Sequence, residues 1–298
     1  MLQAVPLAAK ICAAPKLRCE FNSQPRMANH LVFLILDSCR YDSFARANAP
    51  NMARVGTLER RWSYASWTAP AHYAFLMGMM PHASPHGVFA SEVYKKEFSQ
   101  WVDRLGIPNL SFQSFVPELS LPKVLQGLGY YCVARVSLPV LNPFTLLGRH
   151  FDDYQLMENH SDFAGMIEDI AFEDGQPYFY FLNLGETHYP YMLPKESLPH
   201  ISGVHGVFKG LADGRDPAGD DEFFDSRQMQ SLHQQQIRCV EYLDSLMGRL
   251  FARCPDNTHV IITSDHGELF GEDGYFGHGP IMHEKVFEVP FIEGRVPR

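Results

Sequence analysis

Two apolar runs more than two hundred residues apart each lead to an aspartate, and this shared pattern constrains the fold more than any other feature of the chain. Residues 30–36 are followed directly by Asp37, and residues 259–262 lead through two small polar residues to Asp265 and His266. Both runs are short, continuous and rich in Val, Ile and Leu, which predicts buried strands. In an open α/β sheet, the carboxyl ends of such strands form the crevice where ligands bind.

Acid groups that meet at this edge point to a metal site. Two carboxylates and a histidine in one crevice are stable together when a cation lies between them, because the carboxylates otherwise repel each other. Each segment alone also fits a buried strand followed by a solvated turn. The joint occurrence of Asp37, Asp265 and His266 is what favours the metal.

Composition sets the size of the core and excludes one class of partner. The chain has 298 residues, of which 46% are hydrophobic, and this suits one large globular domain or a domain with a small appendage. Its net charge of -9 speaks against a nucleic-acid partner held through phosphates. A small anionic substrate would need a local positive centre, which a divalent metal supplies.

Cysteine spacing and hydropathy indicate a cytoplasmic protein. The six cysteines show no CxxC spacing, which favours free thiols in a reducing compartment, and no apolar run approaches the ~20 residues of a membrane span. Residues 1–27 make a poor secretory signal, since Lys10 interrupts their apolar stretch. We expect a poorly ordered leader over 1–27 and a catalytic domain over 28–298; a weak transit-like character and a start at Met27 are the alternatives.

Apolar runs alternate with helical patterns along the chain, which predicts a wound α/β sheet. The helix at 226–253 has the clearest periodicity, and its apolar positions are core. The glycine-rich composition of residues 195–225 predicts a long surface excursion. We expect strands at 30–36, 130–136, 177–184 and 258–263, and helices at 50–56, 69–80, 121–128, 161–173 and 226–253.

Thr68 precedes Pro70 and an Ala/Leu/Met-rich run, which is typical of a helix start with Thr68 as N-cap. An ordinary cap is the simpler interpretation. The functional interpretation uses the same geometry, because a hydroxyl at a helix N-terminus lies beside unpaired N–H groups that favour an anion. A nearby cation would make Thr68 a metal-activated nucleophile.

Together, the motifs resemble those of the sulfatase and alkaline-phosphatase superfamily, from about Asn29 to Pro290. This resemblance implies a three-layer α/β/α fold with a mostly parallel mixed central sheet. The motifs that carry it, in order, are Asp37-x-x-Arg40-x-Asp42, Ala49-Pro50-Asn51, Met77-Gly78-Met79-Met80-Pro81, His86-Gly87-Val88, Leu121-Pro122 through Gly129-Tyr130, Thr187-His188-Tyr189-Pro190-Tyr191, Thr263-Ser264-Asp265-His266-Gly267-Glu268, Gly274-Tyr275-Phe276-Gly277-His278-Gly279 and Val289-Pro290.

Carried over by position, the resemblance implies a role for six side chains. Asp37, Asp265 and His266 would bind a divalent metal, with Thr68 as both ligand and nucleophile. His188 and His278 would contact the oxyanion oxygens of the ester or protonate its leaving group. The simpler alternatives are a packed His188 among tyrosines and an exposed His278 in a Gly-rich turn. For Arg40 we expect an ion pair with Asp42 that braces the first loop.

Three departures from the family pattern matter for the chemistry. Threonine at position 68 cannot be oxidised to the formylglycine aldehyde that many sulfatases form from Cys or Ser. His72 replaces the usual arginine, and this resembles the Thr-bearing branch, which includes membrane-anchored phosphoethanolamine and lipoteichoic-acid transferases. Ser38 replaces an aspartate, so one Zn or Mn ion is favoured, with Mg and Ca as alternatives. A second metal could draw only loosely on Glu186, His188 and His278.

The resulting hypothesis is a metal-dependent hydrolase that cleaves a phosphate mono- or diester through a phosphothreonine at Thr68. The alternatives are a sulfuric ester hydrolase without formylglycine, a soluble phosphotransferase and a catalytically silent metal-binding module. Family members usually continue with a C-terminal subdomain, whereas this sequence ends eight residues after Pro290. That shortening favours a reduced protein that forms a homo-oligomer, or a fragment.

Overall fold

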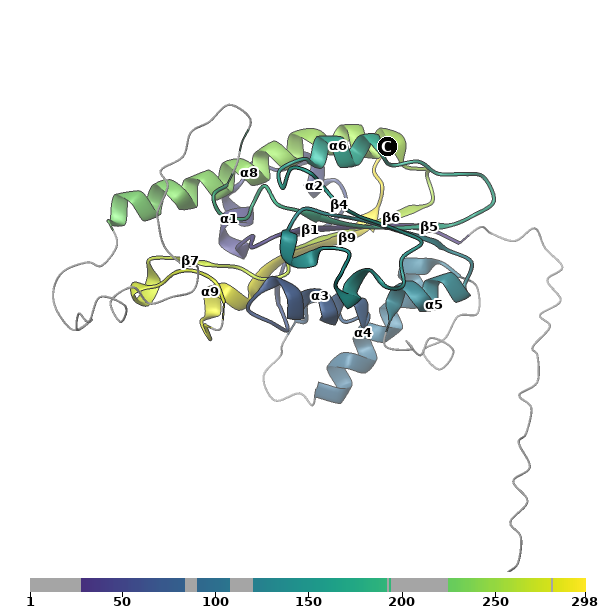
Figure 1. Ribbon diagram of the computed structural model, residues 1–298, viewed down its shortest axis with the longest axis horizontal. Coiled ribbons are helices and arrows are strands. Elements are labelled where there is room, and N and C mark those ends of the chain that lie inside the picture. The colour runs from purple at the N-terminus through teal and green to yellow at the C-terminus, as the bar shows by residue number, and fades with distance from the viewer. Residues whose placement is uncertain (1–27, 84–89, 108–119, 192, 194–224, 280) are drawn as a thin grey trace, which may run out of the picture.

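A seven-stranded mixed sheet lies at the centre of the molecule (Figure 1). The structure, a computed structural model, describes residues 28–83, 90–107, 120–191, 193, 225–279 and 281–298. Five neighbouring strands run parallel, β9 is antiparallel to β6, and β2 is antiparallel to β9. The order is β2 (Glu59–Trp62), β9 (Glu288–Arg295), β6 (Thr258–Thr263), β1 (His30–Leu36), β5 (Tyr178–Leu184), β3 (Tyr131–Val136) and β4 (Asp153–Leu156).

Alternating side chains of β1 divide the core into two halves. Val32, Leu34 and Leu36 pack with one set of helices, and the residues between them pack with another set on the opposite face. The first set is α1 (Tyr41–Arg46), α2 (Pro50–Ala53), α6 (Phe163–Glu168) and α8 (Ser226–Arg253); the second is α3 (Thr68–Leu76), α4 (Ala90–Leu105) and α5 (Leu121–Gly127). The sheet is therefore covered on both faces, and the predicted three-layer α/β/α fold is confirmed (Figure 1).

Short elements decorate the loops around this frame. Two strands of two residues form a separate small sheet, and the remaining elements are single turns. They are η1 (Pro139–Leu141), η2 (Leu146–Gly148), β7 (Leu269–Phe270), η3 (Glu272–Gly274), β8 (Phe276–Gly277) and α9 (Glu284–Phe287). None of the helices in the described ranges combines the length and the apolar character that a membrane span requires.

The expected elements with the clearest patterns are present, and the differences have local causes. The first strand and the helix at 226–253 have the predicted bounds. The helix expected at 161–173 ends at Glu168, because the Ala171 N–H is bonded to the Tyr180 hydroxyl at 3.0 Å and not within a helix. Strand β9 was not predicted, since it contains Pro290 and Gly294, which normally interrupt strands. The leader 1–27 and nearly all of the excursion at 195–225 lie outside the described residues.

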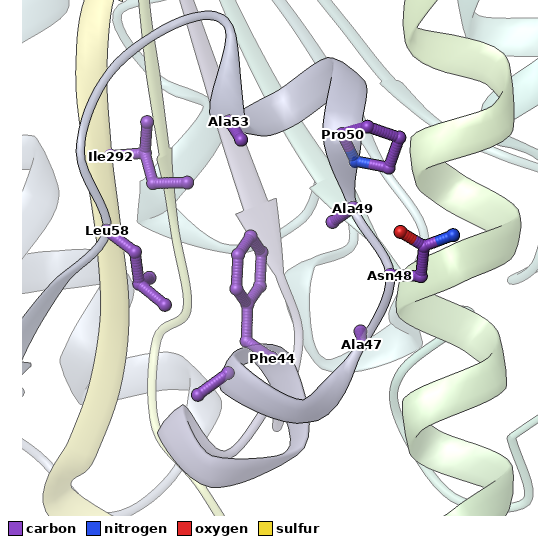
Figure 2. A pocket seen from close by; sticks show the side chains of 9 residues that line it. Phe44, Ala47, Asn48, Ala49, Pro50, Ala53, Leu58 and Ile292 are labelled. Atoms are coloured by element: carbon purple, nitrogen blue, oxygen red, sulfur yellow. The ribbon is translucent and has the colours of Figure 1, made fainter.

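Polar contacts from α8 fix the loop between β1 and β2. The Asp244 carboxylate accepts hydrogen bonds from the Met52 N–H at 2.7 Å and from the Asn51 amide at 3.0 Å. The same loop borders an open, mostly apolar pocket of about 290 Å³ beside β9 (Figure 2). None of the residues with a predicted catalytic or metal-binding role lines it; the lining residues are Phe44, Ala45, Ala47, Asn48, Ala49, Pro50, Ala53, Leu58 and Ile292.

Replacement of Gly294 by alanine should destabilise the fold. A Cβ atom at this position would lie 2.0 Å from the Val55 carbonyl oxygen, so the α2–β2 loop would have to move away from β9. We expect a loss of about 1–3 kcal/mol in the free energy of unfolding, measured by urea denaturation. Gly248→Ala in α8 is the control: a Cβ there meets no atom within 4 Å, and alanine should stabilise the helix by about 0.5–1 kcal/mol. Equal stability of the two variants would contradict the packing argument.

Candidate active site

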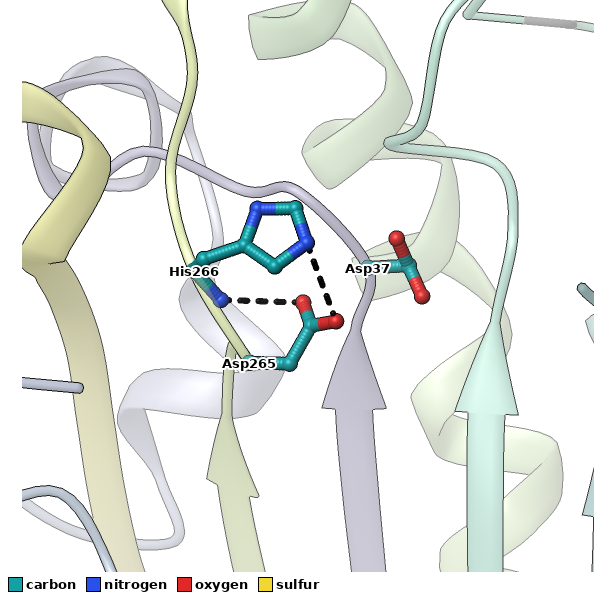
Figure 3. Close-up of side chains that lie close together, drawn as sticks. All are labelled: Asp37, Asp265 and His266. Carbon is teal, nitrogen blue, oxygen red and sulfur yellow. Dashed lines mark hydrogen bonds and ion pairs between the residues drawn. The ribbon is translucent and has the colours of Figure 1, made fainter. Parts of the chain in front are cut away.

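Three predicted metal ligands meet at the carboxyl edge of the sheet. Asp37 follows β1, while Asp265 and His266 follow β6, and these two strands are parallel neighbours. One ligand atom from each residue lies within 4.8 Å of the other two, and all three side chains are fully buried. Figure 3 shows the side chains of Asp265 and His266 beside that of Asp37 at the strand ends. The fold therefore brings the trio together as the sequence predicts.

The two oxygens of Asp265 have different environments. Oδ1 accepts backbone hydrogen bonds from Ser38 and His266, both at 3.0 Å. Ser38 has a φ of 59°, in the left-handed region, and its N–H is bonded to this oxygen of the neighbouring strand's loop. Oδ2 has no hydrogen-bond partner among the described residues. A buried carboxylate oxygen without a partner is costly, and a bound cation would satisfy it.

His266 presents a lone pair to the same point. Its Nδ1–H donates to the Gly267 carbonyl oxygen at 2.9 Å, which leaves Nε2 unprotonated in the neutral ring. Burial lowers the pKa of His266 to about 3, so the ring is neutral at physiological pH. Nε2 lies 3.3 Å from Asp265 Oδ2 (Figure 3). Two electron-rich atoms thus face each other without a proton between them, as metal ligands do.

Burial and mutual repulsion also destabilise the two carboxylates as anions. Desolvation, and then the charge of Asp265, raise the pKa of Asp37. Desolvation raises the pKa of Asp265 to about 6, although its backbone hydrogen bonds oppose the shift. A divalent cation would reverse both effects, because it compensates the two negative charges. The residues present fit such an ion, and two carboxylates with one imidazole suit Zn or Mn well.

Thr68 joins the trio, but its local role differs from the prediction. Trp67 is the N-cap of α3 and Thr68 is the first helical residue, so the predicted N-cap at Thr68 is wrong. The Thr68 side chain points to the metal trio instead of capping the helix: its Oγ1 lies 3.3 Å from His266 Nε2. The hydroxyl thus faces the ligand atoms, and the helix start places it there.

Two further histidines lie next to the trio, as the motifs predict. The ring centroid of His278 is 4.3 Å from that of His266 and 5.3 Å from that of His188. His278 Nδ1 lies 3.6 Å from an oxygen of the buried Glu268 carboxylate. The other Glu268 oxygen accepts a hydrogen bond from the Tyr191 hydroxyl at 2.7 Å. We did not predict a role for Glu268, although it lies two residues after His266 in the same motif.

Other predicted residues have structural positions. Arg40 pairs with Asp42 through two contacts of 2.7 Å, which confirms the expected brace, and also with Glu272 at 2.6 Å. Glu186 lies beside α6, because its Oε1 accepts the Phe163 N–H at 2.8 Å. Its carboxyl group thus serves the start of α6, and we place it outside the metal centre.

A buried glutamine that the sequence analysis missed holds the loops of the site together. The Gln236 amide of α8 lies within 3.0 Å of the carbonyl oxygens of Ser38 and Thr187 and of Glu268 Oε1. These acceptors belong to the loops after β1, β5 and β6. The only sequence signal was a run of three glutamines on an amphipathic helix, which does not indicate which one is buried. One side chain thus fixes the three loops that carry the candidate site.

Comparison with known proteins identifies the family. The sulfatase family matches residues 29–293, nearly the whole described domain. The chain belongs to the sulfatase family. Among curated relatives, the uncharacterized sulfatase YidJ of Escherichia coli is 25% identical in an alignment 137 residues long, which covers 39% of this chain and 26% of the relative. The matched region thus spans about a quarter of that relative.

Solved structures of two EptC domains share the fold. The C-terminal periplasmic domain of EptC from Escherichia coli, in complex with Zn, has a TM-score of 0.57 at 13% identity, over 92% of this chain and 74% of that chain. The same domain of phosphoethanolamine transferase EptC from Campylobacter jejuni has a TM-score of 0.54 at 16% identity, over 91% of this chain and 80% of its own. The chain therefore shares the fold of a domain that was solved with Zn and of a phosphoethanolamine transferase domain.

Asp265→Asn should separate metal binding from stability. Asparagine keeps the shape of the side chain but removes one of two buried negative charges, so the metal-free protein should gain roughly 1–3 kcal/mol at pH 7.5. Zinc should raise the Tm of the wild-type protein by mass action and leave that of the variant unchanged in differential scanning fluorimetry. The control is Asp256→Asn, an exposed residue paired with Arg298. A zinc-induced shift of equal size in Asp265→Asn would contradict the proposed centre.

Glu186 should make stability depend on pH. Burial raises the pKa of Glu186 to about 7, above the value of about 4.3 for an exposed glutamate. The protonated carboxyl therefore stabilises the fold fully below about pH 4.3, and this contribution is lost as the pH rises through about 7. Between pH 5 and pH 8, the wild type should lose about 2–3 kcal/mol relative to Glu186→Gln in urea denaturation. Parallel pH profiles of the two proteins would show that the carboxyl is already ionised at pH 5.

Proposed function

We propose that this chain hydrolyses small phosphate mono- or diesters, with Thr68 as the nucleophile. One observation carries the proposal: Thr68 Oγ1 lies 3.3 Å from His266 Nε2, at the N-terminus of a helix and beside two buried carboxylates. The Thr68 hydroxyl does not cap α3, because the N-cap residue is Trp67 and the helix has no side-chain cap bond. This position supports a role for Thr68 as the nucleophile.

Asp37, Thr68, Asp265 and His266 would hold one divalent ion, with zinc or manganese favoured by the donor set. When bound, such an ion lowers the pKa of a hydroxyl ligand and neutralises charge on the ester oxygens. The protein contributes the remaining parts. It fixes the ligands at strand ends, excludes water through burial and orients the Thr68 hydroxyl.

The proposed reaction has two displacements at phosphorus. In the first, the Thr68 hydroxyl gives its proton to solvent and its oxygen attacks; a bond between Oγ1 and phosphorus forms, and the bond from phosphorus to the leaving alcohol oxygen breaks. The leaving oxygen takes a proton and departs as the alcohol. In the second, water attacks phosphorus and gives one proton to a base, the bond to Oγ1 breaks, and the Thr68 oxygen takes a proton from solvent, which restores the hydroxyl. If another alcohol replaces water, the same intermediate gives a phosphotransferase.

His278 is the favoured acid for the first step. Glu268 places a carboxylate 3.6 Å from Nδ1 of His278, which orients the ring and compensates a positive charge on it. The second ring nitrogen can then donate to the leaving oxygen and later accept a proton from the attacking water. His188 has its Nδ1–H bonded to the Tyr189 carbonyl oxygen at 2.7 Å, which leaves Nε2 as an acceptor for a hydroxyl group of the substrate or for a water molecule. We assign His188 to substrate orientation.

The family also contains sulfatases, so a sulfuric ester hydrolase is the second candidate. In our proposal, the residue at the nucleophile position decides between a phosphate-ester hydrolase and a sulfuric ester hydrolase. Threonine is a secondary alcohol, and its oxidation cannot produce the aldehyde on which formylglycine sulfatases depend. Phosphoryl transfer needs only the hydroxyl. The threonine therefore supports the phosphate ester.

Thr68→Ala should abolish activity without loss of fold. We expect a fall of at least roughly 10³-fold in kcat/KM for a bis-aryl or aryl phosphate with added zinc or manganese, since the covalent step is lost. Thr68→Ser should retain activity, because serine keeps the hydroxyl. Thr145→Ala is the matched control, as its hydroxyl bonds the Asn142 carbonyl oxygen in a loop outside the centre. Aryl phosphate, bis-aryl phosphate and aryl sulfate are compared side by side.

Intact mass spectrometry after rapid quenching supplies the second readout. A phosphoryl increment of about 80 Da on the wild type, absent in Thr68→Ala, is expected from the covalent intermediate. Turnover of aryl sulfate alone would favour the second candidate. Zinc binding without turnover of any of the three esters would indicate a catalytically silent module.

A further inference from the structure

We infer that Asn183 is a positioning residue that holds Asp37 as a one-oxygen ligand, and that His72 completes this arrangement. The inference rests on the proposed metal centre. Asn183 lies in β5 and is fully buried, in a strand whose other residues are apolar or aromatic. A buried amide in such a strand must satisfy two donors and one acceptor within the protein.

The hydrogen bonds of Asn183 fix the orientation of its amide. Its Oδ1 accepts the Ser137 N–H at 3.2 Å, so the NH₂ group points to the other side. There Nδ2 donates to Asp37 Oδ2 at 2.7 Å. The second amide hydrogen faces His72 Nε2 at 3.4 Å. The three contacts join the loop after β1, the loop after β3 and helix α3 through a single side chain.

His72 can take this contact because its tautomer is determined by a stronger bond. Nδ1–H donates to the Thr68 carbonyl oxygen at 2.8 Å, which leaves Nε2 as an acceptor for the amide. The ring packs edge-on against Phe75 and Phe181, with centroid distances of 5.7 and 5.6 Å. An arginine at position 72 could not accept this hydrogen bond, because a guanidinium has only donors. The histidine is thus matched to Asn183.

The contacts of Asp37 decide which of its two oxygens is left for the ion. Oδ2 is engaged by the amide, while Oδ1 has one described contact, a weak bond from the Ser38 hydroxyl at 3.2 Å. Asp37 would therefore bind through Oδ1. His72 also contacts the backbone of Thr68, so the same pair ties the orientation of a ligand to the position of the nucleophile. Loss of the amide should free the carboxylate to rotate and weaken metal binding.

The experiment measures zinc affinity by competition with a chromophoric chelator, with no substrate present. Asn183→Leu is close in shape and has no polar atoms, and it should weaken zinc binding by roughly 10- to 100-fold. His72→Phe keeps the aromatic packing and removes both nitrogens; it should cost about fivefold. The double variant should match Asn183→Leu alone, because both changes break one network. kcat and KM for the aryl phosphate are measured alongside.

Asn51→Leu is the matched control. It removes an amide that donates to a carboxylate, that of Asp244, on the α8 side of the sheet. It should lower stability and leave zinc affinity unchanged. If Asn183→Leu does not fold, the His72→Phe affinity still decides the question, since wild-type affinity in that variant would overturn the inference.

Asp265→Asn distinguishes failure of the inference from failure of the metal centre. Zinc affinity lost in Asp265→Asn and retained in Asn183→Leu would overturn the role of Asn183 alone. Wild-type affinity in Asp265→Asn would overturn the centre on which that role rests. Additive effects of Asn183→Leu and His72→Phe would show two independent contacts and no shared network.

Discussion

The repulsion between two buried carboxylates at neighbouring strand ends is the constraint on which the site depends. Strands β1 and β6 are parallel, with Ile35 opposite Thr263, so the aspartates two residues further along reach the same level of the sheet. Backbone hydrogen bonds fix this register, and neither strand can move its aspartate away without breaking them. The pairing of the two strands therefore holds two negative charges close together, and a cation would compensate them.

Much of the surrounding structure limits how the site can relax. The Ser38 and His266 N–H groups bind one oxygen of Asp265, and Gln236 ties together the loops after three strands. These bonds stop the carboxylates from turning toward solvent. The fold thus maintains an arrangement that is unfavourable without an ion, which is the usual compromise between stability and preorganised function.

The sequence was informative where the cause is local. A strand that ends at an acid is visible in residues 30–37, and two such ends suffice to place the metal trio. Tertiary pairing determines the rest. Pro290 lies in a strand because β6 and β2 flank it, and Asn183 matters only because the neighbouring strand ends at Asp37. By sequence alone, Thr68 fits the N-cap of a helix. In the folded chain its hydroxyl lies beside His266, a contact that depends on the tertiary structure.

The charge of the proposed centre bears on which of the proposed esters it would favour. Burial lowers the pKa of His72 to about 4, so this residue adds no positive charge to the site. In the proposed centre, the charges of the two aspartates and of one divalent ion would cancel. Such a centre would leave little surplus positive charge, so among the proposed esters it would favour a monoanionic diester over a monoester dianion. Phosphodiesters and sulfate monoesters share that charge, which is why the choice between them falls to the nucleophile and not to electrostatics.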